Sequence, residues 1–188
     1  MKLETYPQFH RGPLFSYGTL QDPDVLRIVS GDSSLTCISR MRAWITDYSL
    51  FSVLEGLYPV VRPVGGGVVN GTLFFDVPPA VVDRLIWFEW PEFVPASIDA
   101  LTDVRSYKST FFAAVRTPRA SRDSWSLDVW RANKKDVWLR QTRLAMHFYG
   151  VLTKMELETH WDAIVSHMSG NESDLPLEVI ERCRSYIA

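Results

Sequence analysis

The sequence is poor in cysteine and contains no long apolar run. Its 188 residues include two cysteines, Cys37 and Cys183, which lie far apart and lack the spacing of metal ligands. We therefore expect reduced thiols, no metal site and a cytoplasmic location. The first 13 residues contain no apolar core of a signal peptide, and no run of about 18 apolar residues occurs, so neither secretion nor a membrane span is predicted.

Neither sign of charge predominates in the sequence, and several catalytic patterns are absent from it. The 20 basic and 22 acidic residues give a formal net charge of −2, without a basic patch, which argues against nucleic acid as a partner. His160 and His167 stand seven residues apart, too far for the usual metal pair on one helix. Ser16 lacks the preceding glycine of a hydrolase nucleophile turn. No cofactor is predicted.

The most informative segment is the loop of Tyr17, Gly18, Thr19 and Leu20, which follows an apolar run. A glycine bend at this place can present outward-facing backbone N–H groups to a carboxylate or an oxyanion, and glycine permits a close approach or a positive φ. The alternative is an ordinary turn between a strand and a helix. The signals directly after the loop are those of a helix start, so we expect the loop to be held rigidly.

Periodicity predicts the remaining elements, and 46% hydrophobic content allows one sizeable core with an extension. A short helix is framed by Asp22 as N-cap, Pro23 and Gly31, and a long bent strand follows. The three glycines at residues 65–67 predict the turn of a hairpin. The other predicted elements are a helix opened by Pro79, a strand over 106–115, an exposed connection over 116–124, and helices over 135–149, 153–170 and 175–186. The tryptophans of this last part, among them Trp125, Trp130, Trp138 and Trp161, are read as core or as an oligomer face.

Glu89 is the acid whose position predicts chemistry. It follows Leu85 by four residues, which places it on the apolar stripe of the helix that Pro79 opens, and it stands at the C-terminal end of that helix. Poor solvation and the negative end of the helix dipole both raise the pKa of a carboxyl group. The alternative is a structural carboxylate that ends the helix. Asp76, Asp83 and Glu92 are competitors, of which Asp83 and Glu92 are expected to be solvated.

Three segments in order resemble the γ-glutamylcyclotransferase-like family, also called AIG2-like. The first is Phe-Ser-Tyr-Gly-Thr-Leu over residues 15–20, which is similar to the Tyr-Gly-Ser/Thr-Leu loop of the family. The second is the pair of segments over 58–63 and 69–74, which resembles the next two strands of the family. The third is Leu-Ile-Trp-Phe-Glu over 85–89, which resembles the segment that ends in the acid/base glutamate.

The resemblance implies an α+β fold, with a mixed, mainly antiparallel curved sheet or barrel, packed helices and a helical C-terminal extension. We expect a family domain over residues 12–134 and the extension over 135–188. The implied reaction converts a γ-glutamyl amine or small γ-glutamyl peptide to 5-oxoproline and a free amine or amino acid. Glu89 is then the general acid/base, and Tyr17, Gly18, Thr19 and Leu20 bind the substrate. The implied partner is this small molecule, and the chain is expected to be a monomer or homodimer.

Three positions depart from the family pattern and leave the substrate and the activity open. Trp90 stands where relatives often have glycine, and Phe93 and Pro95 stand where they often have tyrosine and arginine. The indole of Trp90 either walls off part of the pocket or covers the core. The alternative function is a non-catalytic module that binds a small ligand or a protein, with the tryptophan-rich extension as its surface.

Overall fold

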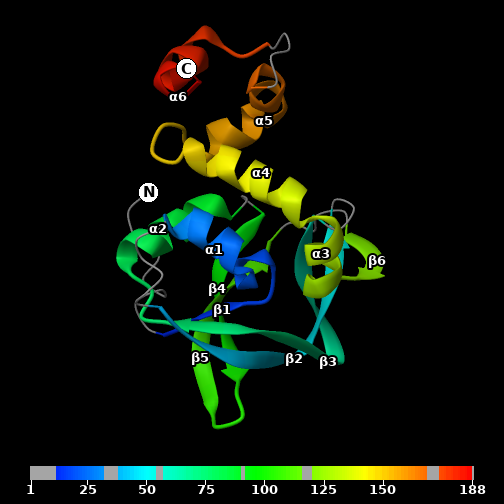
Figure 1. The fold of residues 1–188 in the computed structure, drawn as a ribbon. Helices are drawn as coiled ribbons and strands as arrows, with labels where there is room; N and C mark the ends of the chain where they lie inside the picture. The colour runs from blue at the N-terminus through cyan, green and yellow to red at the C-terminus, as the bar shows by residue number, and fades with distance from the viewer. Residues whose placement is uncertain are drawn as a thin grey trace.

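The computed structural model describes residues 12–31, 38–53, 57–89, 92–115, 120–168 and 174–187. Its strands form a closed ring in the order β3, β1, β5, β4, β2, which returns to β3 (Figure 1). Among the strands of the described residues, only β1 and β5 pair in parallel. The strands are β1 (Leu14–Ser16), β2 (Ser39–Val53), β3 (Tyr58–Phe75), β4 (Phe93–Leu101), β5 (Ser106–Ala114) and β6 (Ala120–Ser124). This mainly antiparallel five-stranded barrel with packed helices confirms the predicted fold class.

The helices lie toward one end of the barrel, opposite the hairpin of β4 and β5 (Figure 1). The helices α1 and α2 pack near the barrel, α4 crosses beside them, and α5 and α6 lie farthest from the sheet. The helical segments are η3 (Thr19–Gln21), α1 (Pro23–Ser30), α2 (Pro79–Phe88), α3 (Leu127–Asn133), α4 (Lys135–His147), α5 (Lys154–Met168) and α6 (Leu177–Ile187). The helices predicted over 135–149 and 175–186 are confirmed within about two residues at each end.

Local capping rules explain where two of these helices begin. At α1, the Asp22 carboxylate accepts a hydrogen bond from the Asp24 N–H at 3.0 Å, and Gly31 ends the helix with a φ of 75°. At α5, the Thr153 N–H donates to Glu156 at 2.8 Å, and the Glu156 N–H donates to the Thr153 hydroxyl at 3.2 Å. Both predicted starts are confirmed.

The glycine triplet at residues 65–67 is not the turn of a hairpin, so that prediction was wrong. β3 runs through it as one strand of 18 residues beside β2. Their register shifts between Thr46 and Tyr48, where Gly66 has a φ of 76° and its N–H donates to Asp47 at 2.9 Å. A Cβ on Gly67 would lie 2.3 Å from the carbonyl oxygen of Tyr48. The glycines therefore allow a bulge at a close backbone approach.

The predicted exposed connection over 116–124 also needs correction. Residues 120–124 form the short strand β6, which pairs with β2 at Phe51 and Val53. The other residues of that segment, 116–119, lie outside the described residues. Polar composition suggested a loop, but a short edge strand needs little apolar surface because one side of it stays in water.

The main hydrophobic core joins the barrel to α4, the first helix of the predicted C-terminal extension. Trp125, Trp130 and Trp138 are all buried in the main hydrophobic cluster, together with residues of α1 and α2. These three indoles are therefore core residues, in line with the first of the two predicted readings. A further cluster around Phe148 and Ile164 links α5 and α6 to the end of α4.

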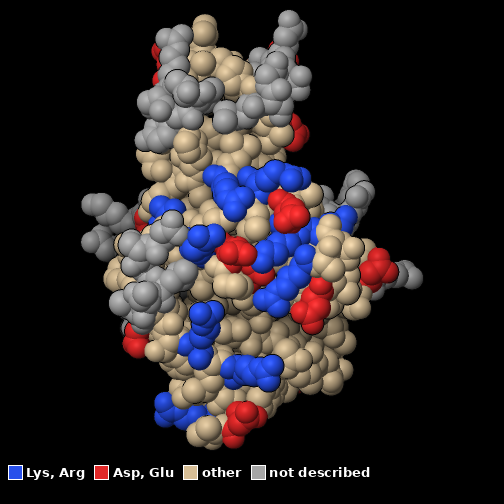
Figure 2. Space-filling model, in the orientation of Figure 1, with Lys and Arg blue, Asp and Glu red and all other residues tan. Residues whose placement is uncertain are grey.

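The surface carries both signs of charge. Figure 2 shows basic and acidic side chains interspersed over the middle of the viewed face. Among the described residues, no helix has the length and apolarity needed to cross a bilayer.

Candidate active site

The loop after β1 is closed by its own backbone. The Gln21 N–H donates to the Gly18 carbonyl at 3.1 Å, and the Asp22 N–H donates to the Thr19 carbonyl at 2.9 Å. Thr19 and Leu20 begin this 3₁₀ turn, so their N–H groups have no acceptor within it. The bend thus offers backbone donors from a short, fixed turn.

Gly18 does not use the positive φ that its sequence context allowed. Its φ is −115°, outside the left-handed region that favours glycine. A Cβ at this position would lie 3.1 Å from Cγ of Pro59, so the missing side chain serves close packing. Room beside the ring of Pro59 is therefore the structural reason for a glycine here.

Glu89 caps the C-terminus of α2. Its N–H donates to the Leu85 carbonyl at 3.0 Å, and its backbone then turns to an extended conformation. The buried residues Val81, Val82 and Leu85 fix the face of the helix that packs on the core. The Glu89 carboxylate is therefore held at the end of a helix that packs firmly on the core.

One cavity brings all the predicted site residues together. Glu89, Tyr17, Gly18, Thr19 and Leu20 line a cavity of about 50 Å³. The remaining walls are mostly apolar and aromatic: Leu14, Phe15, Ser16, Tyr58, Pro59, Phe88, Phe93, Phe112 and Trp138. We call this the Glu89 cavity. A single acid thus faces a small, largely apolar space shared with the loop.

Burial raises the pKa of Glu89 to about 7, and the nearby positive charge of Lys154 opposes that rise. Burial lowers the pKa of Lys154 to about 8, against the attraction of the Glu89 carboxylate. No N···O contact within 4.0 Å joins the two groups among the ion pairs of the described residues. The last carbonyls of α2 also disfavour a negative charge at this place. Glu89 can therefore exchange a proton near neutral pH.

Tyr17 forms a wall of the cavity, and its hydroxyl is used within the fold. The hydroxyl donates to the Phe112 carbonyl at 2.6 Å, and the ring packs edge-on against Phe111. Burial raises the pKa of Tyr17, and the charge of Glu89 adds to the rise. The phenol therefore stays neutral and anchors the loop to β5.

The competing acids lie elsewhere. Asp76 is exposed, and Asp83 is half-buried and accepts a hydrogen bond from the Tyr149 hydroxyl at 2.6 Å. Glu92 was expected to be solvated, yet its Oε2 is buried without a hydrogen-bond partner among the described residues. None of the three lines the Glu89 cavity. Glu89 is thus the acid that faces the loop.

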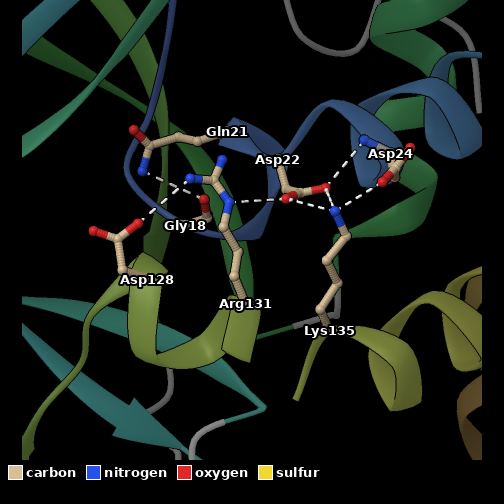
Figure 3. A network of polar contacts seen from close by, with 7 residues as sticks. All are labelled: Gly18, Gln21, Asp22, Asp24, Asp128, Arg131 and Lys135. Atoms are coloured by element: carbon tan, nitrogen blue, oxygen red, sulfur yellow. Dashed lines mark hydrogen bonds and ion pairs between the residues drawn. The ribbon is translucent and has the colours of Figure 1, made fainter. Parts of the chain in front are cut away.

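A buried ion-pair network holds the far end of the loop (Figure 3). The Asp22 side chain is 1% exposed and contacts Arg131 and Lys135, each at 3.0 Å. Burial opposes ionisation of Asp22, but hydrogen bonds from Arg131, Lys135 and the Asp24 N–H outweigh it and lower the pKa of Asp22. The network ties the start of α1, one residue after η3, to α3 and α4.

Sequence reasoning missed Arg131, Lys135 and Lys154 as neighbours of the site. Arg131 and Lys135 follow the loop by more than 100 residues, Lys154 follows Glu89 by 65, and no motif marks them. Phe93 lines the cavity and Pro95 lies in β4, while Trp90 lies outside the described residues. Within the described ranges, no three His, Cys, Asp or Glu side chains gather as a metal site requires.

A family model described as γ-glutamyl cyclotransferase, AIG2-like, matches residues 14–132, which contain Glu89 and the loop. The chain belongs to this AIG2-like family. The match ends near the start of α4, so α4, α5 and α6 lie beyond the part that defines the family.

Two Arabidopsis thaliana proteins are similar to this AIG2-like chain. AIG2-like protein C is 23% identical over 133 residues, which cover 69% of this chain and 75% of that protein. AIG2-like protein D is 22% identical over 134 residues, which cover 69% of this chain and 86% of that protein. A solution structure of an Arabidopsis thaliana protein superposes with a TM-score of 0.51 at 20% identity, over 68% of this chain and 85% of the other. That likeness supports the fold alone.

Proposed function

We propose that the protein is a γ-glutamyl cyclotransferase that converts a γ-glutamyl amine or small γ-glutamyl peptide to 5-oxoproline and a free amine or amino acid. The observation that carries the proposal is the single cavity shared by Glu89, whose pKa is raised to about 7, and the loop of Tyr17, Gly18, Thr19 and Leu20. Membership of the AIG2-like family supports it.

The reaction needs one proton carrier and no redox step. The free α-amine of the substrate attacks its own γ-carbonyl carbon, and Glu89 takes a proton from that amine as the new C–N bond forms. Glu89 then delivers the proton to the leaving nitrogen as the old C–N bond breaks. A glutamate with its ordinary pKa is a weak base toward an ammonium group, whereas one near 7 is well matched.

The loop and the cavity supply the rest of the rate enhancement. Negative charge develops on the γ-carbonyl oxygen, and backbone donors at Thr19 and Leu20 can stabilise it. Such a donor is worth about 3 kcal/mol in other enzymes. The ring closure is intramolecular, so a cavity that holds the substrate folded exploits a large effective molarity.

The test is release of 5-oxoproline from a panel of γ-glutamyl compounds. In Glu89→Gln we expect kcat to fall by about 10²–10⁴-fold, because the amide cannot carry the proton. The matched control is Glu178→Gln at an exposed position on α6, which should keep full activity. Unchanged kcat in Glu89→Gln would remove Glu89 from the reaction. Saturable binding of γ-glutamyl compounds without turnover of any of them would favour a non-catalytic binding module.

A further inference from the structure

Two peptide groups of the loop carry the N–H groups that the proposed reaction uses. One joins Gly18 to Thr19, and the next joins Thr19 to Leu20. All peptide bonds of the described residues are trans. A trans peptide group is planar, and its C=O and N–H point in opposite directions. Whatever holds the carbonyl oxygen of one residue therefore also fixes the direction of the N–H of the next residue.

Both carbonyl oxygens are held by residues that follow them in the chain. The Gly18 carbonyl accepts hydrogen bonds from the backbone N–H of Gln21 at 3.1 Å and from its side-chain amide at 3.4 Å. The Thr19 carbonyl accepts a hydrogen bond from the Asp22 N–H at 2.9 Å. The direction of the Leu20 N–H thus depends on Asp22. A rotated peptide group would present its carbonyl oxygen in place of this N–H, and an oxygen there would repel a developing oxyanion.

Asp22 is itself held at both of its carboxylate oxygens (Figure 3). Its Oδ1 accepts a hydrogen bond from the Asp24 N–H at 3.0 Å and contacts the Lys135 ammonium at 3.0 Å. Its Oδ2 accepts hydrogen bonds from Nε of Arg131 at 3.0 Å and from the same ammonium at 3.1 Å. A buried carboxylate with contacts at both oxygens has one orientation, and its own backbone N–H is fixed with it.

The bond from Arg131 is the most directional side-chain contact of Asp22. A guanidinium is planar and donates in fixed directions, whereas an ammonium is a compact point charge. Lys135 divides its ammonium between Asp22 and Asp24, and it contacts the latter at 2.7 Å. The Nε–H of Arg131 donates to Asp22, while its Nη1 lies 3.5 Å from the exposed Asp128. Lys135 therefore supplies charge, and Arg131 supplies both charge and direction.

We propose that Arg131 is a positioning residue of the site. Through Asp22 it holds the peptide group between Thr19 and Leu20 in the orientation that directs the Leu20 N–H at the γ-carbonyl oxygen of the substrate. This inference rests on the proposed cyclotransferase function. Neither Arg131 nor Asp22 lines the Glu89 cavity, so Arg131 acts through the loop and not by contact with the substrate.

The experiment compares Arg131→Met with the wild type, at a temperature where both are fully folded. Methionine keeps much of the aliphatic stem, and Lys135 still neutralises Asp22. We expect kcat for 5-oxoproline release to fall at least about tenfold, because the loss of one whole oxyanion donor costs about 10²–10³-fold. KM should stay within about twofold, since the donor acts mainly on the transition state. Arg131→Lys keeps the charge without the planar group and should give an intermediate kcat.

Val179→Ala separates positioning from general stability. Val179 is 2% exposed in the outer cluster around Phe148 and Ile164, and it is not part of the Asp22 network. This variant should have a lower melting temperature than the wild type and the same kcat. If kcat falls in Val179→Ala as it does in Arg131→Met, in proportion to the melting temperature, Arg131 is a structural residue only and the proposal is overturned.

Hydrogen exchange of the Asp22 N–H, followed by NMR, tests the same contact without a substrate. We expect this amide to exchange at least about tenfold faster in Arg131→Met and at the wild-type rate in Val179→Ala, because only the former opens the loop locally. Unchanged exchange, or unchanged kcat, in Arg131→Met would refute the positioning role and leave the cyclotransferase function standing. If the wild type turns over no γ-glutamyl compound, the proposed function fails, and the positioning role in catalysis fails with it even where the exchange is faster.

Discussion

At the scale of single residues, the burial of Glu89 disfavours ionisation of its carboxyl group in the folded protein. Burial raises its pKa to about 7 from an ordinary value of 4.5, and Lys154 offsets part of that cost. The folded state therefore binds a proton that the unfolded chain releases between these two pH values. Below about pH 4.5 the group is protonated in both states and its burial carries no charge penalty.

This proton linkage gives a stability prediction for Glu89→Gln. As the pH rises from 4.5 to about 7, the wild type should lose about 1–3 kcal/mol of unfolding free energy relative to the variant. Urea denaturation of both proteins at several pH values measures the difference. A gap independent of pH would mean that Glu89 titrates as an ordinary solvated carboxyl group.

The raised pKa of Glu89 could be predicted from its sequence position, while its partner Lys154 could not. An acid on the apolar stripe at the end of a helix is poorly solvated wherever the helix packs. Lys154 follows Glu89 by 65 residues and sits in the first turn of another helix, so only the packing of α5 near α2 brings them together.

At the scale of elements, the ion pairs of Asp22 connect the substrate loop to the C-terminal helices. Asp22 caps α1 and at the same time binds cations from α3 and α4 (Figure 3). Removing one partner of a buried ion pair leaves the remaining charges uncompensated, which costs more than the pair contributes when it is intact.

For Asp22→Asn we expect a loss of about 3 kcal/mol in unfolding free energy, since asparagine still caps the helix but leaves Arg131 and Lys135 without their shared charge. Asp128→Asn is the matched control: Asp128 also pairs with Arg131 but is 92% exposed, so it should change stability by less than about 0.5 kcal/mol. Because the pKa of Asp22 is lowered, the difference between wild type and Asp22→Asn should shrink only as the pH falls below its ordinary value of 3.8. Equal effects of the two substitutions would show that the buried network contributes no more than a surface pair.

Local signals predicted element ends better than element partners. The Asp22 cap, the helix start at residue 153 and the helix opened by Pro79 all depend on residues within four positions, and each was confirmed. The triplet at residues 65–67 misled because three glycines suit a hairpin turn and a bulge equally well. The neighbouring backbone of β2 decides between a turn and a bulge, and the periodicity of the sequence does not reveal which strand lies beside the glycines.

At the scale of the whole molecule, the family barrel and the C-terminal helices share one core. Trp138, Leu139 and Met146 of α4 are buried in the same cluster as α1 and α2, whereas Leu157, Ile164 and Val179 belong to an outer cluster. The sequence suggested a boundary near residue 134, where the predicted helices of the C-terminal extension begin. Because buried side chains of α4 belong to the same cluster as those of α1 and α2, we infer that α4 is needed to cover this part of the core.

Two truncations test this division. A chain that ends at residue 134 loses three buried side chains from the main cluster, each worth about 2–5 kcal/mol, which together exceed the usual stability of a domain. It should show no cooperative thermal transition. A chain that ends at residue 168 loses Leu175 and α6 from the outer cluster and should unfold cooperatively at a lower temperature, with the Glu89 cavity retained. Differential scanning calorimetry distinguishes the cases: a cooperative transition in the shorter chain would show that residues up to 134 fold as an independent domain, and that the C-terminal helices serve the site alone.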